Sequence, residues 1–315
     1  MLRASTSRRS GLSRVPEQCD VPAGGVGCRS RHFRRRFRSF SSACSLPVRR
    51  PSAKVFERTY ADANLVYEFD AIQGRQIMIT EERLHRVALP AYVAERIALR
   101  RGTPHAFERI DPARTALVVV DLQNGFMAPG QPAEMPVARA IVPNVNRLAE
   151  ATRKAGGAVI WLKHTFDQET AQTWSIWRTS FISSDWGQRM EEAFTPGSFG
   201  HEIYADLKKA PNDLVVLKRR FSALVQGSSG LDQILRQRGI DTLIIVGTAT
   251  NVCCESTLRD GMMMNYKCVM VSDANATRTD EEHNATLSTV AVIFGDVRTT
   301  DEVVALLNAR SNISA

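Results

Sequence analysis

Several hallmarks of common protein classes are missing from this sequence. Its 315 residues contain no uninterrupted apolar run of about 18 residues, so it predicts no transmembrane helix. The six cysteines form no C-x-x-C pair and show no Cys/His ligand spacing, which argues against a zinc site. No secretory signal is evident, so we expect free thiols in a reducing compartment. The cysteines are Cys19, Cys28, Cys44, Cys253, Cys254 and Cys268.

Acidic residues are scarce in the first 50 positions, which hold 12 arginines, no lysine and only Glu17 and Asp20. The remaining 29 Lys+Arg residues face 31 Asp+Glu residues, so the formal net charge of +8 falls to −2 once the first 50 residues are left out. The basic character therefore belongs to one segment, and the rest offers no basic face to a phosphate backbone. We expect neither a nucleic-acid nor a membrane partner.

Residues 1–77 are interpreted as a disordered, basic Arg/Ser-rich extension. They have too little periodic apolar surface to offset the entropy cost of ordering. The run Arg34–Ser42 resembles a mitochondrial presequence. Alternatively, the extension is an over-extended gene model with the natural start at Met78, or a functional basic tail. We expect a cytoplasmic protein, or a mitochondrial matrix protein if the presequence is genuine.

Residues 78–110 are predicted to form a peripheral helical arm. Thr80 is a plausible helix N-cap, and Glu81 and Glu82 suit a first helical turn. Pro90 should break or kink this helix. The arm is expected to pack on the core or on a second subunit, and we expect a homo-oligomer, either a dimer or a tetramer.

Residues 111–315 alternate short apolar runs with helical patterns. The expected strands are 116–120, 158–162, 214–217, 242–246 and 268–271, with a short one near Val297. The expected helices are 137–155, 231–238, 252–265, 279–293 and 301–307. Apolar runs indicate strands buried on both faces, and intervening helices force parallel pairing. The pattern predicts an α/β domain with a doubly wound, mainly parallel six-stranded sheet and helices on both faces.

Polar side chains follow the ends of several predicted strands. Asp121, His164, Lys218 and the segment Gly247–Cys253 should meet at one rim of the sheet, where ligands bind in such folds. The long insertion 165–212 carries aromatic residues and is typical of a lid or a binding wall. It could equally form a satellite core or a subunit contact. Its aromatic residues include Trp174, Trp177, Phe181 and Trp186.

Cys253 lies in a turn between a buried strand and a helix. A helix N-terminus favours thiolate and can hold an oxyanion, although a cysteine there is often only a small buried residue. Asp121 could act as general base and Lys218 could steady the thiolate. Individually, the aspartate could be a helix cap and the lysine a solvated residue, but the three together indicate nucleophilic catalysis.

Three segments in this order resemble the isochorismatase-like cysteine hydrolase family over about Thr115–Leu307. The segments are Val118–Asn124, Leu217–Ala223 and Gly247–Cys253, the last followed by Glu255–Thr257. Within that family, the chain looks most like ureidoacrylate amidohydrolase and N-carbamoylsarcosine amidase. The resemblance implies a catalytic triad of Asp121, Lys218 and Cys253. It also implies a cis peptide at Thr248–Ala249 and an oxyanion hole formed by the N–H groups of Ala249 and Cys253.

The substrate pocket is expected to draw on the first motif, the second strand, the insertion and the Lys218 motif. The candidate substrate-binding residues are Gln123, Asn124, Phe126, His164, Trp174, Trp177 and Phe221. Two positions depart from the family pattern. Cys254 stands where relatives usually have an apolar residue, and Phe221 stands where ureidoacrylate enzymes tend to have tyrosine.

Metal ligation is the feature in which the chain differs from nicotinamidase relatives. Those enzymes place an Asp-x-His and a further histidine after the second strand, whereas Leu162–Asp167 has only His164. We predict no catalytic metal and no cofactor. His164 is expected to be a rim or substrate-contact residue, with a structural role as the alternative.

The sequence as a whole predicts a cysteine-dependent amidohydrolase acting on a small non-peptide amide, ureido or carbamoyl substrate through a thioester. An isochorismatase-type vinyl ether hydrolase and a catalytically idle binding module are the alternatives. The pKa of Cys253 should be lowered by Lys218 and the helix N-terminus, while Asp121 opposes this. The free enzyme is then either neutral thiol with carboxylate, or thiolate with protonated Asp121.

Overall fold

The computed structural model describes residues 82–309. The predictions for residues 1–77, and those for Met78, Thr80 and Glu81, lie outside the described residues. Within the described part of the chain, no helix is both long and apolar enough to cross a membrane.

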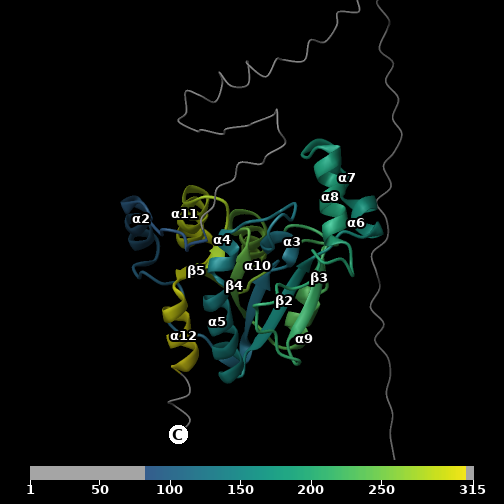
Figure 1. Cartoon of the computed structure of the whole chain (residues 1–315). Coiled ribbons are helices and arrows are strands. Elements are labelled where there is room, and N and C mark those ends of the chain that lie inside the picture. Colours follow the sequence, from purple (N-terminus) through teal and green to yellow (C-terminus); the bar gives the residue numbers. More distant parts are fainter. Residues whose placement is uncertain (1–81, 310–315) are drawn as a thin grey trace, which may run out of the picture. The chain divides into compact units, whose positions relative to one another are not determined.

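Six parallel strands form one sheet in the order β3-β2-β1-β4-β5-β6 (Figure 1). Their bounds are β1 Thr115–Val120, β2 Ala158–His164, β3 Leu214–Lys218, β4 Thr242–Thr248, β5 Lys267–Ala276 and β6 Asp296–Arg298. Every residue of β1 is buried, as expected for a central strand covered on both faces. The chain winds outward from β1 in both directions, which confirms the predicted doubly wound sheet.

Helices cover both faces of this sheet (Figure 1). Leu117 and Val119 of β1 pack in one cluster with α5 and α12, while Ala116 and Val118 pack in another with α9, α10 and α11. This alternation follows from the two-residue period of a strand. The helices are α2 Ala91–Arg101, α3 Asn124–Met127, α4 Val137–Ala140, α5 Val142–Lys154, α6 Gln168–Thr173, α7 Ser175–Ser180, α8 Ser184–Phe194, α9 Leu231–Gln237, α10 Glu255–Met263, α11 Asp280–Thr289 and α12 Thr300–Asn308.

Three of the predicted helices are interrupted in the structure. The helix expected over 137–155 changes at Ile141 into a separate α5. The one expected over 252–265 begins as a π turn at Thr250–Cys254, and the one over 279–293 ends as a π turn at Val290–Phe294. Helical periodicity in the sequence does not distinguish a π turn from α-helix, because both bury apolar residues at similar spacing.

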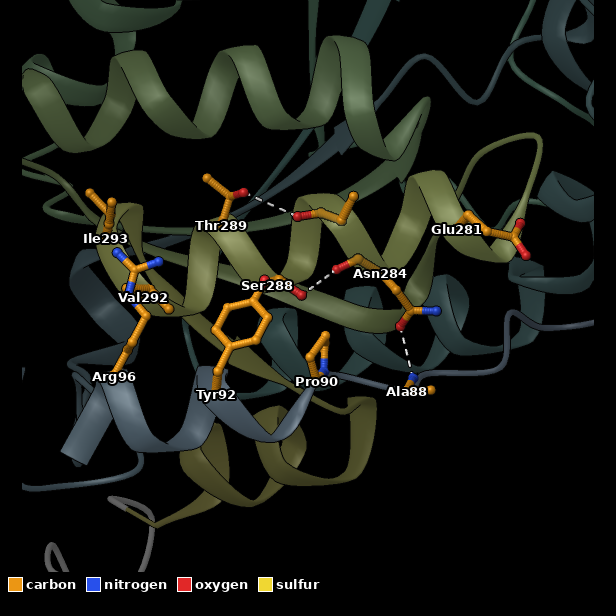
Figure 2. Close-up of a pocket in the computed structure, with 11 residues that line it drawn as sticks. Ala88, Pro90, Tyr92, Arg96, Glu281, Asn284, Ser288, Thr289, Val292 and Ile293 are labelled. Carbon is orange, nitrogen blue, oxygen red and sulfur yellow. Dashed lines mark hydrogen bonds between the residues drawn. The ribbon is translucent and has the colours of Figure 1, made fainter. Parts of the chain in front are cut away.

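The arm differs from the helix expected from Thr80. Residues 84–90 are not helical, and α2 begins only after Pro90. A residue before proline avoids the α region, and the arm's backbone is instead bonded to α11. The Ala88 N–H donates to Asn284 Oδ1 at 2.8 Å, and Asn284 Nδ2 donates to the Arg86 carbonyl at 2.8 Å. Figure 2 shows this segment lying along α11. A cavity of about 450 Å³ lies between α2 and α11.

The insertion after β2 forms α6, α7 and α8, which stand beyond the ends of β2 and β3 (Figure 1). Its aromatic residues stack on one another, and Trp177 and Trp186 also pack against the core cluster that contains Leu117 and Val119. Trp177 stacks on Trp174 with ring centroids 5.3 Å apart and on Phe166 at 5.4 Å. Phe181 is 75% exposed and takes no part in this stack. The insertion is thus an aromatic wall above the rim.

Candidate active site

The carboxyl ends of four neighbouring strands meet at one rim of the sheet. Asp121 follows β1, His164 and Lys218 are the last residues of β2 and β3, and β4 leads into the turn that holds Cys253. Asp121 has a left-handed backbone conformation with φ of 53°. That conformation is uncommon for a buried non-glycine residue and often marks a functional position. The rim is where the sequence placed these side chains.

Lys218 and Asp121 form a fully buried ion pair. The Lys218 Nζ lies 2.7 Å from Asp121 Oδ2, and both side chains are inaccessible to solvent. The ammonium also donates to His164 Nδ1 at 3.2 Å and to the Arg220 carbonyl at 3.1 Å. Three acceptors therefore match the three N–H donors of the lysine, which fixes its charge in place.

Burial and mutual attraction set the protonation of this group. Burial raises the pKa of Asp121, and Lys218 opposes the rise. Burial alone would lower the pKa of Lys218, but Asp121 and Cys253 together outweigh it and the pKa is raised. Burial, together with Lys218, holds the pKa of His164 well below its usual value. His164 is therefore neutral, and its Nδ1 is an acceptor for the lysine.

Cys253 is buried at the wall of a cavity, in the π turn Thr250–Cys254. Its thiol lies within hydrogen-bonding reach of both Asp121 and Lys218. Burial raises the pKa of this thiol to about 12, Lys218 acts to lower it, and Asp121 raises it further. The sequence-based expectation of a lowered pKa is wrong, because desolvation exceeds the effect of the lysine. The free enzyme holds a neutral thiol.

The turn before Cys253 depends on glycine. Gly247 has a φ of 121°, and a Cβ there would lie 2.1 Å from the Val120 carbonyl oxygen. β4 therefore approaches β1 closely at the rim. The peptide bond between Thr248 and Ala249 is cis, as the family resemblance implied. The Ala249 carbonyl accepts hydrogen bonds from the N–H groups of Val252 and Cys254, which shapes the turn.

A cavity of about 270 Å³ opens beside Cys253. Its walls combine the rim, the aromatic insertion and the start of α11. The lining residues are Phe126, Ala133, Met135, His164, Trp177, Ile182, Trp186, Met190, Phe221, Ala249, Asn251, Val252, Cys253, Thr277, Arg278 and Glu282. Trp174 is outside this lining but supports it, with its ring centroid 4.8 Å from that of Phe221.

Gln123 and Asn124, two of the candidate substrate-binding residues, are outside the lining of this cavity. The Gln123 amide donates to the carbonyls of His164 and His201, and its oxygen accepts from the His164 N–H. Asn124 Nδ2 donates to the Phe199 carbonyl. The amides of both side chains hold the insertion against the rim. A polar motif next to a catalytic aspartate does not reveal whether its amides face substrate or backbone.

Arg278 and Glu282 line the cavity but were not anticipated from the sequence. The fifth strand was expected to end at Val271, whereas β5 continues to Ala276. The ladder with β4 is interrupted after Met270 and resumes at Asn275, opposite Gly247. If the fifth strand had been predicted to end at Ala276, Arg278 would have been expected at the rim. Among the described residues, Arg278 has no hydrogen-bond or ion-pair partner, and burial lowers its pKa.

The two adjacent cysteines have different surroundings. Cys253 lines the cavity, whereas Cys254 is fully buried and packs in the cluster beneath α10. Burial raises the pKa of Cys254 well above its usual value. The geometry therefore presents only the first of the pair to a ligand. Within residues 82–309, no cluster of three His, Cys, Asp or Glu side chains is arranged to hold a metal ion.

The sequence matches the Isochorismatase domain family over residues 115–302. The chain belongs to the isochorismatase family. A solved cysteine hydrolase from Pseudomonas syringae pv. phaseolicola 1448A is 31% identical, with a TM-score of 0.59, over 66% of this chain and 98% of that one. An isochorismatase family protein from Burkholderia thailandensis is 28% identical, with a TM-score of 0.53, over 64% and 98%.

Membership of the isochorismatase family places the chain among hydrolases, but the subfamily is open. N-carbamoylsarcosine amidase from Thermoplasma acidophilum is 26% identical, with a TM-score of 0.49, over 60% of this chain and 97% of that one. This similarity is too distant to assign a substrate. The isochorismatase-family match accounts for the sheet, the rim and the turn around Cys253, while the substrate must be argued from the cavity itself.

Proposed function

We propose that the protein is a cysteine-dependent amidohydrolase that cleaves the C–N bond of a small non-peptide amide, ureido or carbamoyl substrate. The observation that carries the proposal is the placement of the Cys253 thiol at the cavity wall, within reach of the buried Asp121–Lys218 pair. A nucleophile, a base and a fixed cation around one enclosed space are the parts that acyl transfer requires.

The acylation step follows from a neutral thiol. Asp121 accepts the Cys253 proton as the sulfur attacks the carbonyl carbon, so no free thiolate accumulates. The tetrahedral oxyanion is placed against the N–H groups of Ala249 and Cys253. Collapse breaks the C–N bond, the departing nitrogen takes the proton from Asp121, and a thioester remains on Cys253.

Deacylation uses the same groups in reverse. Asp121 removes a proton from water, which attacks the thioester carbon. The C–S bond then breaks, and the thiol recovers its proton. Lys218 stays charged throughout, held by three acceptors, and stabilises the negative charge that passes between sulfur and carboxylate.

The cavity favours a small substrate that carries an anionic group. Its volume of about 270 Å³ is just below the range usual for drug-sized ligands. Aromatic side chains such as Trp177 and Phe221 enclose one side. Arg278 supplies a guanidinium that makes no hydrogen bond or close ion pair among the described residues, although the Glu282 carboxylate in the same cavity attracts it. A carboxylate at one end of the substrate would pair with that guanidinium. Ureido and carbamoyl acids combine both features.

The test is a panel of small ureides, carbamoyl amino acids and amides, assayed for release of ammonia or amine. Each acid is paired with its neutral analogue of equal length. We expect turnover, with the acids favoured through a lower KM. Trapping of an acylated Cys253 by rapid denaturation and mass spectrometry would support the thioester. Cleavage of a vinyl ether without a covalent intermediate would favour the isochorismatase-type alternative, and no turnover in any class would favour an idle binding module.

A further inference from the structure

The arm reaches the active site through one side chain. His85 lies in the extended segment before Pro90 and is itself almost fully buried, with 2% of its side chain exposed. It inserts against the turn that joins β5 to α11, far away in the sequence. Its ring stacks on His283 of α11, with centroids 4.3 Å apart and an angle of 19° between the rings. The arm is therefore anchored beside the site rather than merely resting on the surface.

The two ring nitrogens of His85 bind both ends of that turn. Nε2 accepts a hydrogen bond from the Thr277 N–H at 3.0 Å, so Nε2 carries no proton. In the neutral ring the proton is then on Nδ1, which donates to Asp280 Oδ1 at 2.8 Å. Thr277 is the first residue after β5, and Asp280 is the first residue of α11. One imidazole thus bridges the segment from end to end.

Arg278 is held within the bridged segment and lines the cavity. Among the described residues its guanidinium makes no hydrogen bond or close ion pair and is attracted only at longer range by Glu282, so its position depends on the backbone that carries it. That backbone is fixed on the site side by Thr277 Oγ1, which donates to Asn251 Oδ1 at 2.6 Å. On the outer side it is fixed by His85. Without the histidine, the turn would lose one contact at each end.

We propose that His85 is a positioning residue that clamps the segment 277–280, and that the arm thereby sets the preference of the site for anionic ligands through Arg278. The inference rests on the proposed function for the identity of the ligand class. It makes the segment 82–90 part of the active site's construction, although none of its residues lines the cavity beside Cys253. Ala88 and Pro90 line the separate cavity shown in Figure 2.

The test compares alkylation of Cys253 by 3-bromopropionate and by 3-bromopropionamide, two probes that differ in charge and little in size. The modified peptide is quantified by mass spectrometry, and the ratio of the two rates reports the cation's influence. His85→Phe keeps a ring on His283 but has neither nitrogen. We expect the acid-to-amide ratio to fall about fivefold, the effect of one weakened charge pair. Arg278→Met should lower the acid-to-amide ratio at least as much. Adding His85→Phe to Arg278→Met should lower the ratio no further.

The matched control is Arg83→Ala. Arg83 lies in the same arm and pairs with the same carboxylate, with its Nη2 3.0 Å from Asp280 Oδ2, whereas the Thr277 N–H is bonded by His85. It should leave the ratio unchanged. The inference is overturned if folded His85→Phe has the wild-type ratio. If His85→Phe does not fold, His85→Ala takes its place in this comparison. A wild-type ratio in Arg278→Met would also overturn the inference. The probes report on the site without turnover. If the variants shift the ratio but the protein hydrolyses no substrate, the proposed function is contradicted while the role of His85 is supported.

Discussion

At the scale of single residues, the two adjacent cysteines can be separated by substitution. Cys253→Ala should lower turnover by at least about 1,000-fold, because it removes the proposed nucleophile. Cys254→Ala should keep most activity, because that side chain packs in the core and does not line the cavity. Turnover of folded variants on a common substrate is the measurement. Equal losses in the two variants would contradict the assignment of the nucleophile.

The pKa of the Cys253 thiol gives a second residue-scale prediction. Because burial raises this pKa to about 12, the thiol is neutral at pH 7 and its alkylation rate should climb as the pH rises. Lys218 favours the thiolate, so Lys218→Met should move the alkylation curve to still higher pH and slow acylation. Lys218→Arg should not restore the wild-type curve, because a planar guanidinium cannot meet the three acceptors around the ammonium.

The measurement is the rate of iodoacetamide labelling of Cys253 against pH for the wild type and for both lysine variants. Circular dichroism serves as the control for folding, since removing one partner of a buried pair costs about 3–5 kcal/mol. Coincident curves for wild type and Lys218→Met would show that the lysine does not tune the thiol.

At the scale of secondary-structure elements, the close approach of β4 to β1 is the most demanding feature. Gly247→Ala should lower the free energy of unfolding by more than about 2 kcal/mol, because the added Cβ meets strand backbone that cannot move aside. Gly239→Ala is the matched control: its φ is 65° and a Cβ there meets no atom within 4 Å. It should cost only about 1 kcal/mol for the left-handed backbone. Urea unfolding of both variants tests the difference, and equal losses would argue against it.

At the scale of the whole molecule, we predict that removing residues 1–77 leaves a folded and active enzyme. The family match begins only at residue 115, and the P. syringae cysteine hydrolase is covered over 98% of its length by 66% of this chain. The truncated protein should also have an isoelectric point well below 9.4, because most of the excess arginine is removed. Isoelectric focusing and turnover measure both effects. An insoluble or inactive truncation would contradict the prediction.

Metal dependence is a further property of the whole enzyme. Within residues 82–309 no suitable ligand cluster is present, and every step proposed above uses side chains and backbone of this chain. Overnight treatment with EDTA should therefore leave turnover unchanged, with a known metallohydrolase as the positive control for chelation. Loss of activity that zinc or manganese restores would show a metal site.

The oligomeric state stays a prediction at this scale. Leu99 of α2 is 88% exposed and Phe181 of the insertion is 75% exposed, and such large apolar side chains are candidates for a subunit contact. We propose a dimer or tetramer, which light scattering of the purified protein would distinguish from a monomer.

The sequence by itself determined the elements that depend on local periodicity. Continuous apolar runs predicted the central strands, and helical spacing predicted the helices between them, so the parallel order and the common rim followed. The strand order alone therefore predicts that Asp121, Lys218 and Cys253, which follow or end strands, lie close together. The order of the three sequence motifs likewise indicated the family.

The tertiary structure alone decided what depends on contacts between distant segments. His85 reaches Thr277 across 192 positions, and the irregular ladder between β4 and β5 carries Arg278 to the rim. Neither contact leaves a periodic trace in the sequence. The pKa of Cys253 belongs here too, because its sign depends on how completely neighbouring segments exclude water. Periodicity records which side of an element is buried, whereas desolvation and cross-chain hydrogen bonds depend on what the rest of the fold places against it.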